Sequence, residues 1–519
     1  MKTLRLVFIE DDPRVAEQLK PHYTKLLIGC GYSVEFFDAQ NELNARKIID
    51  TQDPHGFICD LGFDKDYGGL HLIRALRISY PDLFVIGTSM GGYTNSMVDT
   101  RQPTFHMFLD KQAILGGDAR YIKLSQERFL VQFKLETALR ISNIDTILGE
   151  EFHKPAAKRE LVGLIRQIMF AGHAPDDLMH PDEVALEPMS GGFSGSQVFK
   201  MISRNSKSGI VCIPSVLKVS KREFAAQELE NYHRFVKWGL PYTWRVDVLG
   251  YGETKNYGAI AYSFILSDLK KFESLTDLLR RKDDDGVMTV IRTLFSPEMR
   301  RWYGDPLIRS EENIVERYAN RYFRGVESKG LSEKTFLLVA QKEFAARLSG
   351  NKIEISGKSY ELPSPALFGR PMNKYLSCIC HGDLNSNNVM VASNGQVIFI
   401  DFQETGRGHV FEDFVTMEAS VRLYHGDENL RGLALLEAEQ AIREGDDVAG
   451  LTGAARIAAE IRRLARSNFP SESFETYYYA SASFNFRLLR AKQLTSGQAS
   501  RAVAAVLAAL NDLAGFRRS

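Results

Sequence analysis

Cysteine and tryptophan are scarce in this chain, and neither sign of charge is in excess. The five cysteines are scattered, and the pair Cys378 and Cys380 has no second pair with which to complete a zinc site. Charged side chains cancel to a formal net charge of +0, which excludes a global field that would draw the chain to nucleic acid or acidic lipid. No apolar run approaches the roughly 20 residues that cross a bilayer, and no signal peptide pattern follows Met1. We therefore expect a cytoplasmic protein that binds neither nucleic acid nor membrane.

The most informative stretch is a polar turn beside an apolar strand. Residues 380–388 read CHGDLNSNN, and residues 397–402 read VIFIDF. Phosphoryl transfer from ATP needs one carboxylate to orient or deprotonate the attacking hydroxyl, and an amide and a second carboxylate to hold Mg²⁺ on the phosphates. Asp383 has the place of the base, and Asn388 and Asp401 offer the hard oxygen ligands that Mg²⁺ prefers. The alternative is an ordinary turn before a hairpin, in which the asparagines only suit the loop.

A glycine-rich segment precedes a strand pattern upstream of this turn. Glycines let the backbone approach phosphate oxygens and point N–H groups at them. Taken alone, the segment fits a simple hairpin turn equally well. The residues that would contact phosphate are Gly191, Gly192, Ser194, Gly195 and Ser196.

A lysine follows inside the next apolar strand pattern, at residues 215–219. A charge in such a strand is costly to bury unless it is paired, so Lys218 needs a partner. Phe224, Glu228 and Tyr232 fall on one face of the predicted helix that follows, so we expect Glu228 to face inward and pair with Lys218. Lys218 would then contact the ATP phosphates. The alternative is a surface lysine whose stem lies on apolar neighbours.

Together these motifs make residues 185–515 resemble the aminoglycoside phosphotransferase and choline kinase group of the protein-kinase-like superfamily. Within that group the chain is most similar to a bacterial family described as ternary complex associated domain. The resemblance implies a bilobal α+β domain with a large helical C-lobe, and the use of ATP and Mg²⁺. It also implies that Gly408 and Asp413 fill the places of a Gly and an Asp that brace the catalytic loop. Phe402-Gln403 after Asp401, with no Ala-Pro-Glu beyond, argues against a eukaryotic-type protein kinase.

The N-terminal part holds a second group of polar residues, each at the end of an apolar strand pattern. The patterns cover residues 4–9, 56–59, 83–87 and 105–109. Ligands bind at the carboxyl ends of the strands in doubly wound sheets, so the pattern predicts a site there. The residues that follow the strands are Glu10, Asp11, Asp12, Asp60, Thr88, Ser89, Asp110 and Lys111.

Residues 1–125 thereby resemble the receiver domain of two-component response regulators, a doubly wound, flavodoxin-like α/β fold. The resemblance implies that Asp11 and Asp12 hold Mg²⁺ with Asp60, and that Asp60 accepts a phosphoryl group from a histidine kinase or phosphotransfer protein. It also implies that Thr88, or Ser89 if the strand end shifts by one, binds the phosphoryl group and that Lys111 pairs with it. Phe108 has the place of an aromatic residue whose rotamer changes with phosphorylation. Gln112 replaces the usual proline, and residues 62–66 form an unusual acidic loop. A flavodoxin-like domain without phosphorylation is the alternative.

Four parts follow from these patterns. We assign residues 1–125 to the receiver, 126–184 to a helical linker, 185–270 to the kinase-like N-lobe and 271–519 to the C-lobe with a helical insertion. Residues 129–140 would continue the receiver's last helix, and apolar positions in residues 156–171 have helical spacing. This second stripe is either a homodimer interface or coupling element, or plain intramolecular packing.

Two function classes remain open. The first is a receiver-controlled, ATP-dependent phosphotransferase that acts on a hydroxyl of a small molecule. The second is a catalytically silent, nucleotide-binding module that relays the receiver state to a protein partner. A base, two metal ligands and a lysine are all present, which favours catalysis. A DNA-binding regulator is disfavoured, because no compact basic helix-turn-helix follows residue 125.

Overall fold

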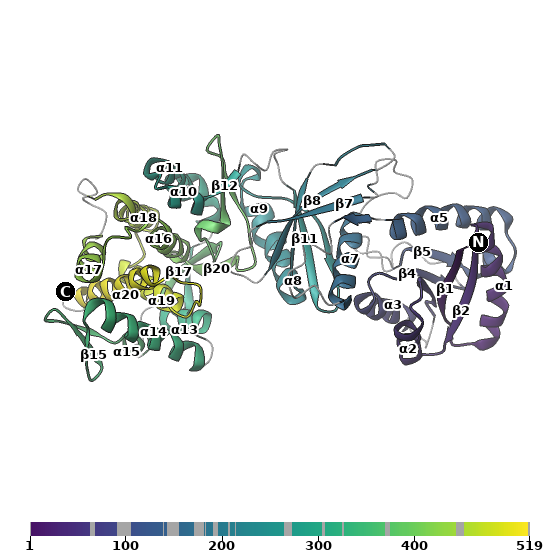
Figure 1. Cartoon of the computed structure of the whole chain (residues 1–519), viewed down its shortest axis with the longest axis horizontal. Coiled ribbons are helices and arrows are strands. Elements are labelled where there is room, and N and C mark those ends of the chain that lie inside the picture. Colours follow the sequence, from purple (N-terminus) through teal and green to yellow (C-terminus); the bar gives the residue numbers. More distant parts are fainter. Residues whose placement is uncertain are drawn as a thin grey trace. The chain divides into compact units, whose positions relative to one another are not determined.

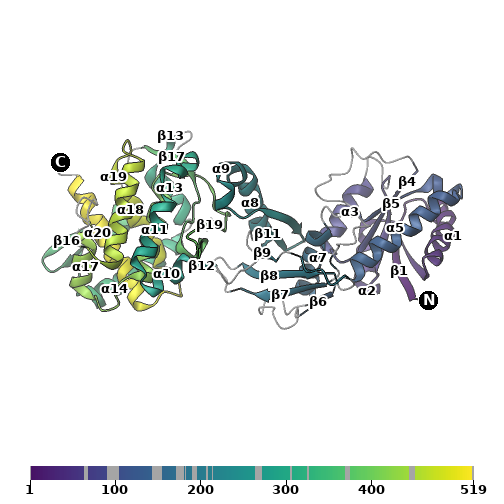
Figure 2. The same cartoon turned by 90° about the horizontal axis from the view of Figure 1, so that it is seen from above.

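The computed structural model describes residues 2–62, 68–90, 105–138, 140–142, 155–170, 181, 183–189, 196–205, 208–212, 214–263, 272–303, 307–323, 326–368, 374–442 and 451–516. The chain divides into two compact units (Figures 1 and 2). The first unit holds Met1–Gln227 and Asp247–Ser267, and the second holds Glu228–Val246 and Asp268–Ser519. Among the described helices, none is long and apolar enough to span a membrane.

The first unit begins with a five-stranded parallel sheet in the order β2-β1-β3-β4-β5 (Figure 1). Because side chains alternate along a strand, β1 turns Leu4, Leu6 and Phe8 to one face and Val7 and Ile9 to the other. Both faces are therefore apolar and need a layer of helices. The strands are β1 (Lys2–Ile9), β2 (Tyr32–Ala39), β3 (Gly56–Asp60), β4 (Phe84–Ser89) and β5 (Met107–Asp110).

Helices cover both faces of this sheet. α1 (Pro13–Gly29) and α5 (Ala119–Ala138) pack on the face of Leu4 and Phe8, whereas α2 (Glu42–Gln52) and α3 (Gly68–Ser79) pack on the face of Val7. A short α4 (Lys111–Leu115) follows β5. The strand order and the two helical layers are those of a doubly wound, flavodoxin-like sheet. This confirms the fold class predicted for the N-terminal part and the continuation of its last helix beyond residue 129.

A six-stranded sheet in the order β10-β11-β9-β8-β7-β6 completes the first unit. All its pairs are antiparallel except β6 with β7. α7 (Pro155–Phe170) packs its apolar stripe on one face of this sheet. The strands are β6 (Arg140–Ser142), β7 (Glu183–Pro188), β8 (Gln197–Arg204), β9 (Ser215–Lys221), β10 (Val248–Glu253) and β11 (Tyr257–Ser263), and α8 (Arg222–Asn231) follows β9.

α7 presents a second, polar face to the receiver-like sheet. Arg159 Nη2 lies 2.6 Å from Asp53 Oδ1, just before β3, and Arg166 Nη1 donates to the Asp82 carbonyl at 3.3 Å, just before β4. Between them Gly163 sits against Pro81 so closely that a Cβ would lie 2.4 Å from the proline Cβ. These three positions, four and three apart, form one stripe of the helix. α7 therefore makes intramolecular contacts on two sides, with the parallel sheet and with the six-stranded sheet of the first unit.

The second unit is mainly helical. Its three small sheets have the orders β12-β18-β19, β13-β17-β20 and β14-β15-β16. The strands are β12 (Phe272–Ser274), β13 (Ile308–Asn313), β14 (Arg347–Ser349), β15 (Lys352–Ile355), β16 (Lys358–Glu361), β17 (Lys374–Cys380), β18 (Val389–Ala392), β19 (Val397–Phe399) and β20 (Gly406–His409). The helices are α9 (Lys237–Gly239), α10 (Leu275–Arg281), α11 (Asp284–Leu294), α12 (Arg300–Tyr303), α13 (Ile314–Tyr322), α14 (Val326–Phe344), α15 (Pro363–Phe368), α16 (Glu412–His425), α17 (Gly432–Ala441), α18 (Gly453–Asn468), α19 (Phe474–Leu488) and α20 (Ser496–Phe516). The sheet of the first unit and the helices of the second fit the predicted α+β class.

Candidate functional site

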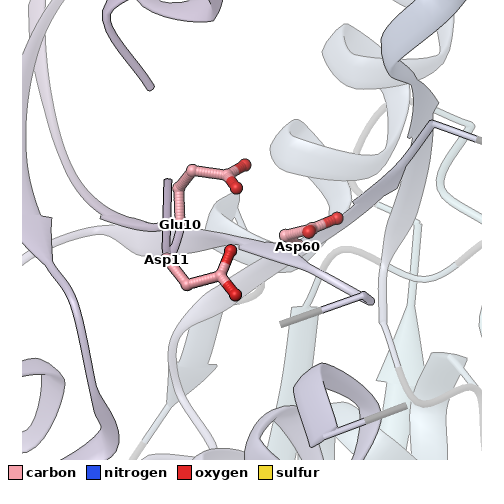
Figure 3. A group of neighbouring side chains, drawn as sticks. All are labelled: Glu10, Asp11 and Asp60. Carbon is pink, nitrogen blue, oxygen red and sulfur yellow. The ribbon is translucent and has the colours of Figure 1, made fainter. Parts of the chain in front are cut away.

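Three carboxylates meet at the carboxyl edge of the parallel sheet. Glu10 and Asp11 follow β1, and Asp60 ends β3, the strand beside it. Each offers an oxygen within 4.8 Å of the others, and Figure 3 shows the three side chains beside one another. Parallel strands end at the same edge of a sheet, which is why residues 50 positions apart converge here.

Lys111 binds two of these carboxylates. Its Nζ lies 2.6 Å from Glu10 Oε2 and 2.9 Å from Asp60 Oδ1, and the lysine is buried. Burial raises the pKa of Glu10, although Lys111 opposes the rise. Three carboxylates and one ammonium leave an excess of negative charge made of hard oxygen atoms. This donor set fits a divalent cation such as Mg²⁺.

Of the three metal ligands predicted at this edge, the structure brings Asp11 and Asp60 together and leaves Asp12 outside the group. Asp11 lies in the carboxylate group, whereas Asp12 is exposed and caps α1, where Oδ1 accepts a hydrogen bond from Arg14 N at 2.9 Å. Glu10 takes the remaining place in the group. Asp12 followed by Pro13 is a helix-start pattern, so this pattern was the signal that favoured a capping role for Asp12.

Thr88 lies beside Asp60, with which it is paired in register between β3 and β4. It is buried, and its hydroxyl lies 2.9 Å from the hydroxyl of Tyr23 on α1. Burial raises the pKa of Tyr23 well above its usual value, so the phenol stays protonated. Ser89 and Phe108 are partly exposed near the same edge. The structure thus brings Asp60, Thr88 and Lys111 together, and of the acidic loop it describes only Gly62.

The His-Gly-Asp turn of the second unit follows β17 and is held by Asp413. Asp413 Oδ2 accepts from His381 N at 2.8 Å, and Oδ1 accepts from Gly382 N at 2.9 Å. Gly382 has φ +83°, and a Cβ there would lie 2.2 Å from the Glu404 carbonyl oxygen. Only glycine fits this backbone. The turn aims Asp383 from a rigid support, and Asp413 occupies the bracing place that the resemblance implied.

Asn388 and Asp401 are tied to the same turn. Asn388 Nδ2 donates to the Asp383 carbonyl at 2.8 Å, which leaves the amide oxygen able to bind a cation. His381 Nε2 lies 3.0 Å from the Ile400 carbonyl, and Ile400 N donates to the Asn388 carbonyl at 3.1 Å. Asp401 itself has φ +66°, a left-handed conformation that is rare outside glycine and occurs at functional sites. An amide oxygen and a carboxylate here fit Mg²⁺.

An ion cluster around the buried Glu412 supports the turn from the helical side. Arg321 Nη2 donates to the Gly382 carbonyl at 2.5 Å, and Arg321 Nε lies 2.6 Å from Glu412 Oε1. Burial alone would raise the pKa of Glu412, but Arg321 and Arg317 together lower it below the usual value. Gly408 is needed here, because a Cβ would lie 2.6 Å from Glu412 Oε2. No sequence motif indicated Arg321 or Glu412.

Asp383 is placed in an environment that disfavours its charge. Burial raises the pKa of Asp383 to about 6, with Arg487 opposing the rise and Asp401 adding to it. A carboxylate whose pKa lies near neutrality is suited to accept a proton in catalysis.

The aromatic side chains of Trp302 and Tyr303 are buried and pack in the core with rings such as Phe399 and Phe414.

The remaining predicted ATP contacts are distributed over both units. Lys218 in β9 is buried and alternates with Leu217 and Val219, which face α7, so it lies on the opposite face of the sheet. Glu228 is buried too, and its Oε1 accepts from Phe402 N at 3.4 Å, next to Asp401. Phe224 lies in the first turn of α8 and is 38% exposed, so it is not buried with Glu228 and Tyr232 as predicted. Ser196 is buried, whereas Gly191, Gly192, Ser194 and Gly195 lie outside the described residues.

Most of these residues lie in a region of the chain that matches one known protein family. The family described as ternary complex associated domain 9 matches residues 182–332 and 327–468, more than half of the chain. The chain belongs to this family. The matched region of the ternary complex associated domain 9 protein includes Lys218, Glu228, Asp383, Asn388 and Asp401. No curated protein matches the chain.

The N-terminal and the C-terminal parts of this protein are each similar to solved structures. A thermostable mutant of aminoglycoside phosphotransferase APH(4)-Ia, in a ternary complex with ADP and hygromycin B, shares 12% identity over 63% of this chain and 93% of its own, with a TM-score of 0.33. APH(3'')-Id from Streptomyces rimosus shares 14% identity over 63% of this chain and 93% of its own, with a TM-score of 0.28. The N-terminal domain of a response regulator from Carboxydothermus hydrogenoformans shares 17% identity over 24% of this chain and 95% of its own, with a TM-score of 0.19. The fold assignment rests on the strand orders and helix packing described above.

Proposed function

We propose that this protein is an ATP-dependent phosphotransferase that acts on a hydroxyl of a small molecule and is controlled by its receiver. The arrangement around Asp383 carries this proposal: a carboxylate on a braced turn, with Asn388 and Asp401 tied to the same turn by the Ile400 hydrogen bonds. An ordinary hairpin turn would not need the buried Asp413 or the hydrogen bond from Arg321 that support this one.

Each residue then has one role. Asp383 accepts the proton of the acceptor hydroxyl, and Asn388 and Asp401 would hold Mg²⁺, which neutralises charge on the phosphates when it is bound. Lys218 is assigned to the phosphates with Glu228 as its proposed partner, and the glycine-rich sequence of residues 191–196 is assigned to the same phosphates. The reaction moves the terminal phosphoryl group of ATP to the acceptor oxygen, releases ADP and leaves the hydroxyl proton on Asp383.

Consumption of ATP tests the proposal. The purified protein is incubated with ATP, Mg²⁺ and a cytosolic metabolite extract, and mass spectrometry of the same extract identifies any phosphorylated product. Acceptor-dependent turnover supports a phosphotransferase. If no turnover occurs while ATP still raises the melting temperature, the protein is instead a silent nucleotide-binding module that relays the receiver state.

The receiver is expected to take a phosphoryl group on Asp60. Its carboxylate lies 2.9 Å from Lys111 Nζ and within the Glu10–Asp11 group, so Mg²⁺ and the lysine can both neutralise the incoming phosphoryl oxygens. Asp60→Asn should abolish Mg²⁺-dependent labelling by acetyl phosphate, measured by intact mass. Asp12→Asn is the matched control, since an asparagine keeps the helix cap. Equal labelling of wild type and Asp60→Asn would exclude Asp60 as the phosphoacceptor.

α7 is expected to transmit the receiver state to the β10–β11 sheet. Gly163→Ala places a Cβ against Pro81, within 2.4 Å of its Cβ, where a rigid ring cannot yield. We expect faster amide exchange in residues 79–84 and a smaller change of ATP turnover on receiver phosphorylation. Gly330→Ala on α14 is the control, because its Cβ would meet nothing within 4 Å. Unchanged exchange and unchanged response in Gly163→Ala would contradict coupling through α7.

A further inference from the structure

Three arginines surround Tyr322 at the end of α13. The guanidinium carbon of Arg487 lies 4.8 Å from the Tyr322 ring centre, and that of Arg321 lies 5.8 Å from it. Arg490 Nη1 donates to the Tyr322 carbonyl at 2.6 Å. Because Arg321 also donates to the Gly382 carbonyl, the cluster reaches the residue that precedes the predicted base, Asp383.

Arg487 and Arg490 differ from Arg321 and Arg462 of the same unit in having no acidic partner among the described residues. Arg321 is paired with Glu412, and Arg462 on α18 is paired with Glu418. Within the described part of the chain, Arg487 and Arg490 form no ion pair with a carboxylate, and the Arg487 guanidinium donates no hydrogen bond. It rests only on the rings of Tyr322 and Phe484.

The Arg487 guanidinium is only half-buried, and its five N–H donors have no protein acceptor among the described residues, so they are open to a ligand. Stacking on an aromatic ring orients such a group and leaves its planar fork available to an anion. Arg487 is also the strongest electrostatic influence on Asp383 from any charged side chain. The fork therefore lies in the field of the base that would receive the acceptor hydroxyl.

We propose that the acceptor is an anionic hydroxyl compound, whose carboxylate or phosphate is bound by Arg487 while its hydroxyl meets Asp383. This inference rests on the proposed function and adds the charge class of the substrate. A planar anion can accept two parallel hydrogen bonds from the fork, which fixes its orientation as well as its charge. A cationic acceptor would be repelled by the two unpaired arginines, Arg487 and Arg490.

The test separates the metabolite extract by charge. Anion-exchange and cation-exchange resins give an anionic, a cationic and a neutral fraction, and each is tested on full-length protein for ATP consumption and for a melting-temperature shift with ADP and Mg²⁺ present. Variants are Arg487→Gln, Arg487→Lys, which keeps the charge without the fork, and Arg456→Gln as an exposed control on α18. Melting curves without extract show whether each variant is folded.

We expect the anionic fraction alone to support turnover, and Arg487→Gln to raise the KM for it about 10-fold to 100-fold, with the KM for ATP unchanged. The KM of Arg487→Lys for the anionic fraction should lie between those of wild type and Arg487→Gln, and the KM of Arg456→Gln should match that of wild type. Turnover with the neutral or cationic fraction overturns the inference, and so does an equal rise in the KM for ATP, which would assign Arg487 to the nucleotide. If no fraction supports turnover, the proposed phosphotransferase function fails, and the melting shift then tests the anion site by itself. A melting shift that the anionic fraction gives to wild type but not to Arg487→Gln supports an anion site at Arg487. The absence of such a shift overturns it.

Discussion

Replacing Asp383 by asparagine is expected to lower the rate of phosphoryl transfer by about 100-fold to 10,000-fold, the usual contribution of a general base. Asparagine keeps the shape of the side chain and cannot accept the hydroxyl proton. The turn should remain in place, because Asp413 holds it through the backbone of His381 and Gly382. The measurement is acceptor-dependent ADP release, with ATP affinity followed by the melting shift.

The thermal stability of Asp383→Asn should stay the same or rise, although its rate of phosphoryl transfer falls. The two measurements therefore separate an effect on catalysis from an effect on folding. Burial raises the pKa of Asp383 to about 6, above the unfolded value of about 3.9. The favourable contribution of the protonated form is present below the unfolded pKa and lost as the pH rises through the folded pKa. At pH 7.5 the ionised carboxylate therefore destabilises the fold, and Asp383→Asn should melt at the same or a higher temperature. The wild-type rate should also fall as the pH drops below about 6.

Two outcomes would contradict this role. Wild-type turnover in Asp383→Asn would mean that another group accepts the proton. A variant that melts well below wild type would mean that the carboxylate is needed for folding, and the lost rate would then say nothing about a base. Asp427→Asn, an exposed acid beyond α16, is the control for a general effect of charge.

Glu418→Gln is expected to destabilise the second unit by about 3–5 kcal/mol, the usual cost of leaving a buried charge unpaired. Glu418 Oε1 lies 2.9 Å from Arg462 Nη2, and the carboxylate also binds Arg422 and the Tyr477 hydroxyl. Both arginines are nearly inaccessible to water. Glutamine keeps the volume but removes the charge that both guanidinium groups share.

Tryptophan fluorescence measures this change in the second unit alone, because Trp238, Trp244 and Trp302 all lie in it. The midpoint of thermal unfolding should fall by roughly 10 °C, at about 2–4 °C per kcal/mol for a unit of this size. Glu437→Gln, an exposed position on α17, should leave the midpoint unchanged. A shift in Glu418→Gln no larger than that of Glu437→Gln would mean that the cluster is not a net source of stability.

The pH dependence gives a second measurement of the same cluster. Burial alone would raise the pKa of Glu418, but Arg422 and Arg462 lower it to about 2. A lowered folded pKa contributes stability above the unfolded value of about 4.3, and this stability is lost as the pH falls towards the folded value. The difference in unfolding free energy between wild type and Glu418→Gln should therefore shrink below pH 4 or so.

The local elements of both domains were predictable because their patterns are short. Leu4 to Ile9 is apolar except for Arg5, and a short run of that kind that ends in acids indicates a buried parallel strand. The spacing of Asp383, Asn388 and Asp401 places three polar residues on a turn and on the next hairpin, and these are contacts within 20 positions. The sequence by itself therefore determined the two fold classes and the local grouping of Asp383, Asn388 and Asp401.

Only the tertiary structure decided what supports that site. Arg321 reaches Gly382 across 61 positions, and Arg317 reaches Glu412 across 95. A pairing over such a distance depends on how helices pack, and no local period encodes it. The same applies to Glu10, whose Lys111 partner is 101 positions away, and to the contact of Gly163 with Pro81. Short-range spacing fixes which groups are present, whereas long-range packing fixes which of them are buried, and burial sets their charge and their partners.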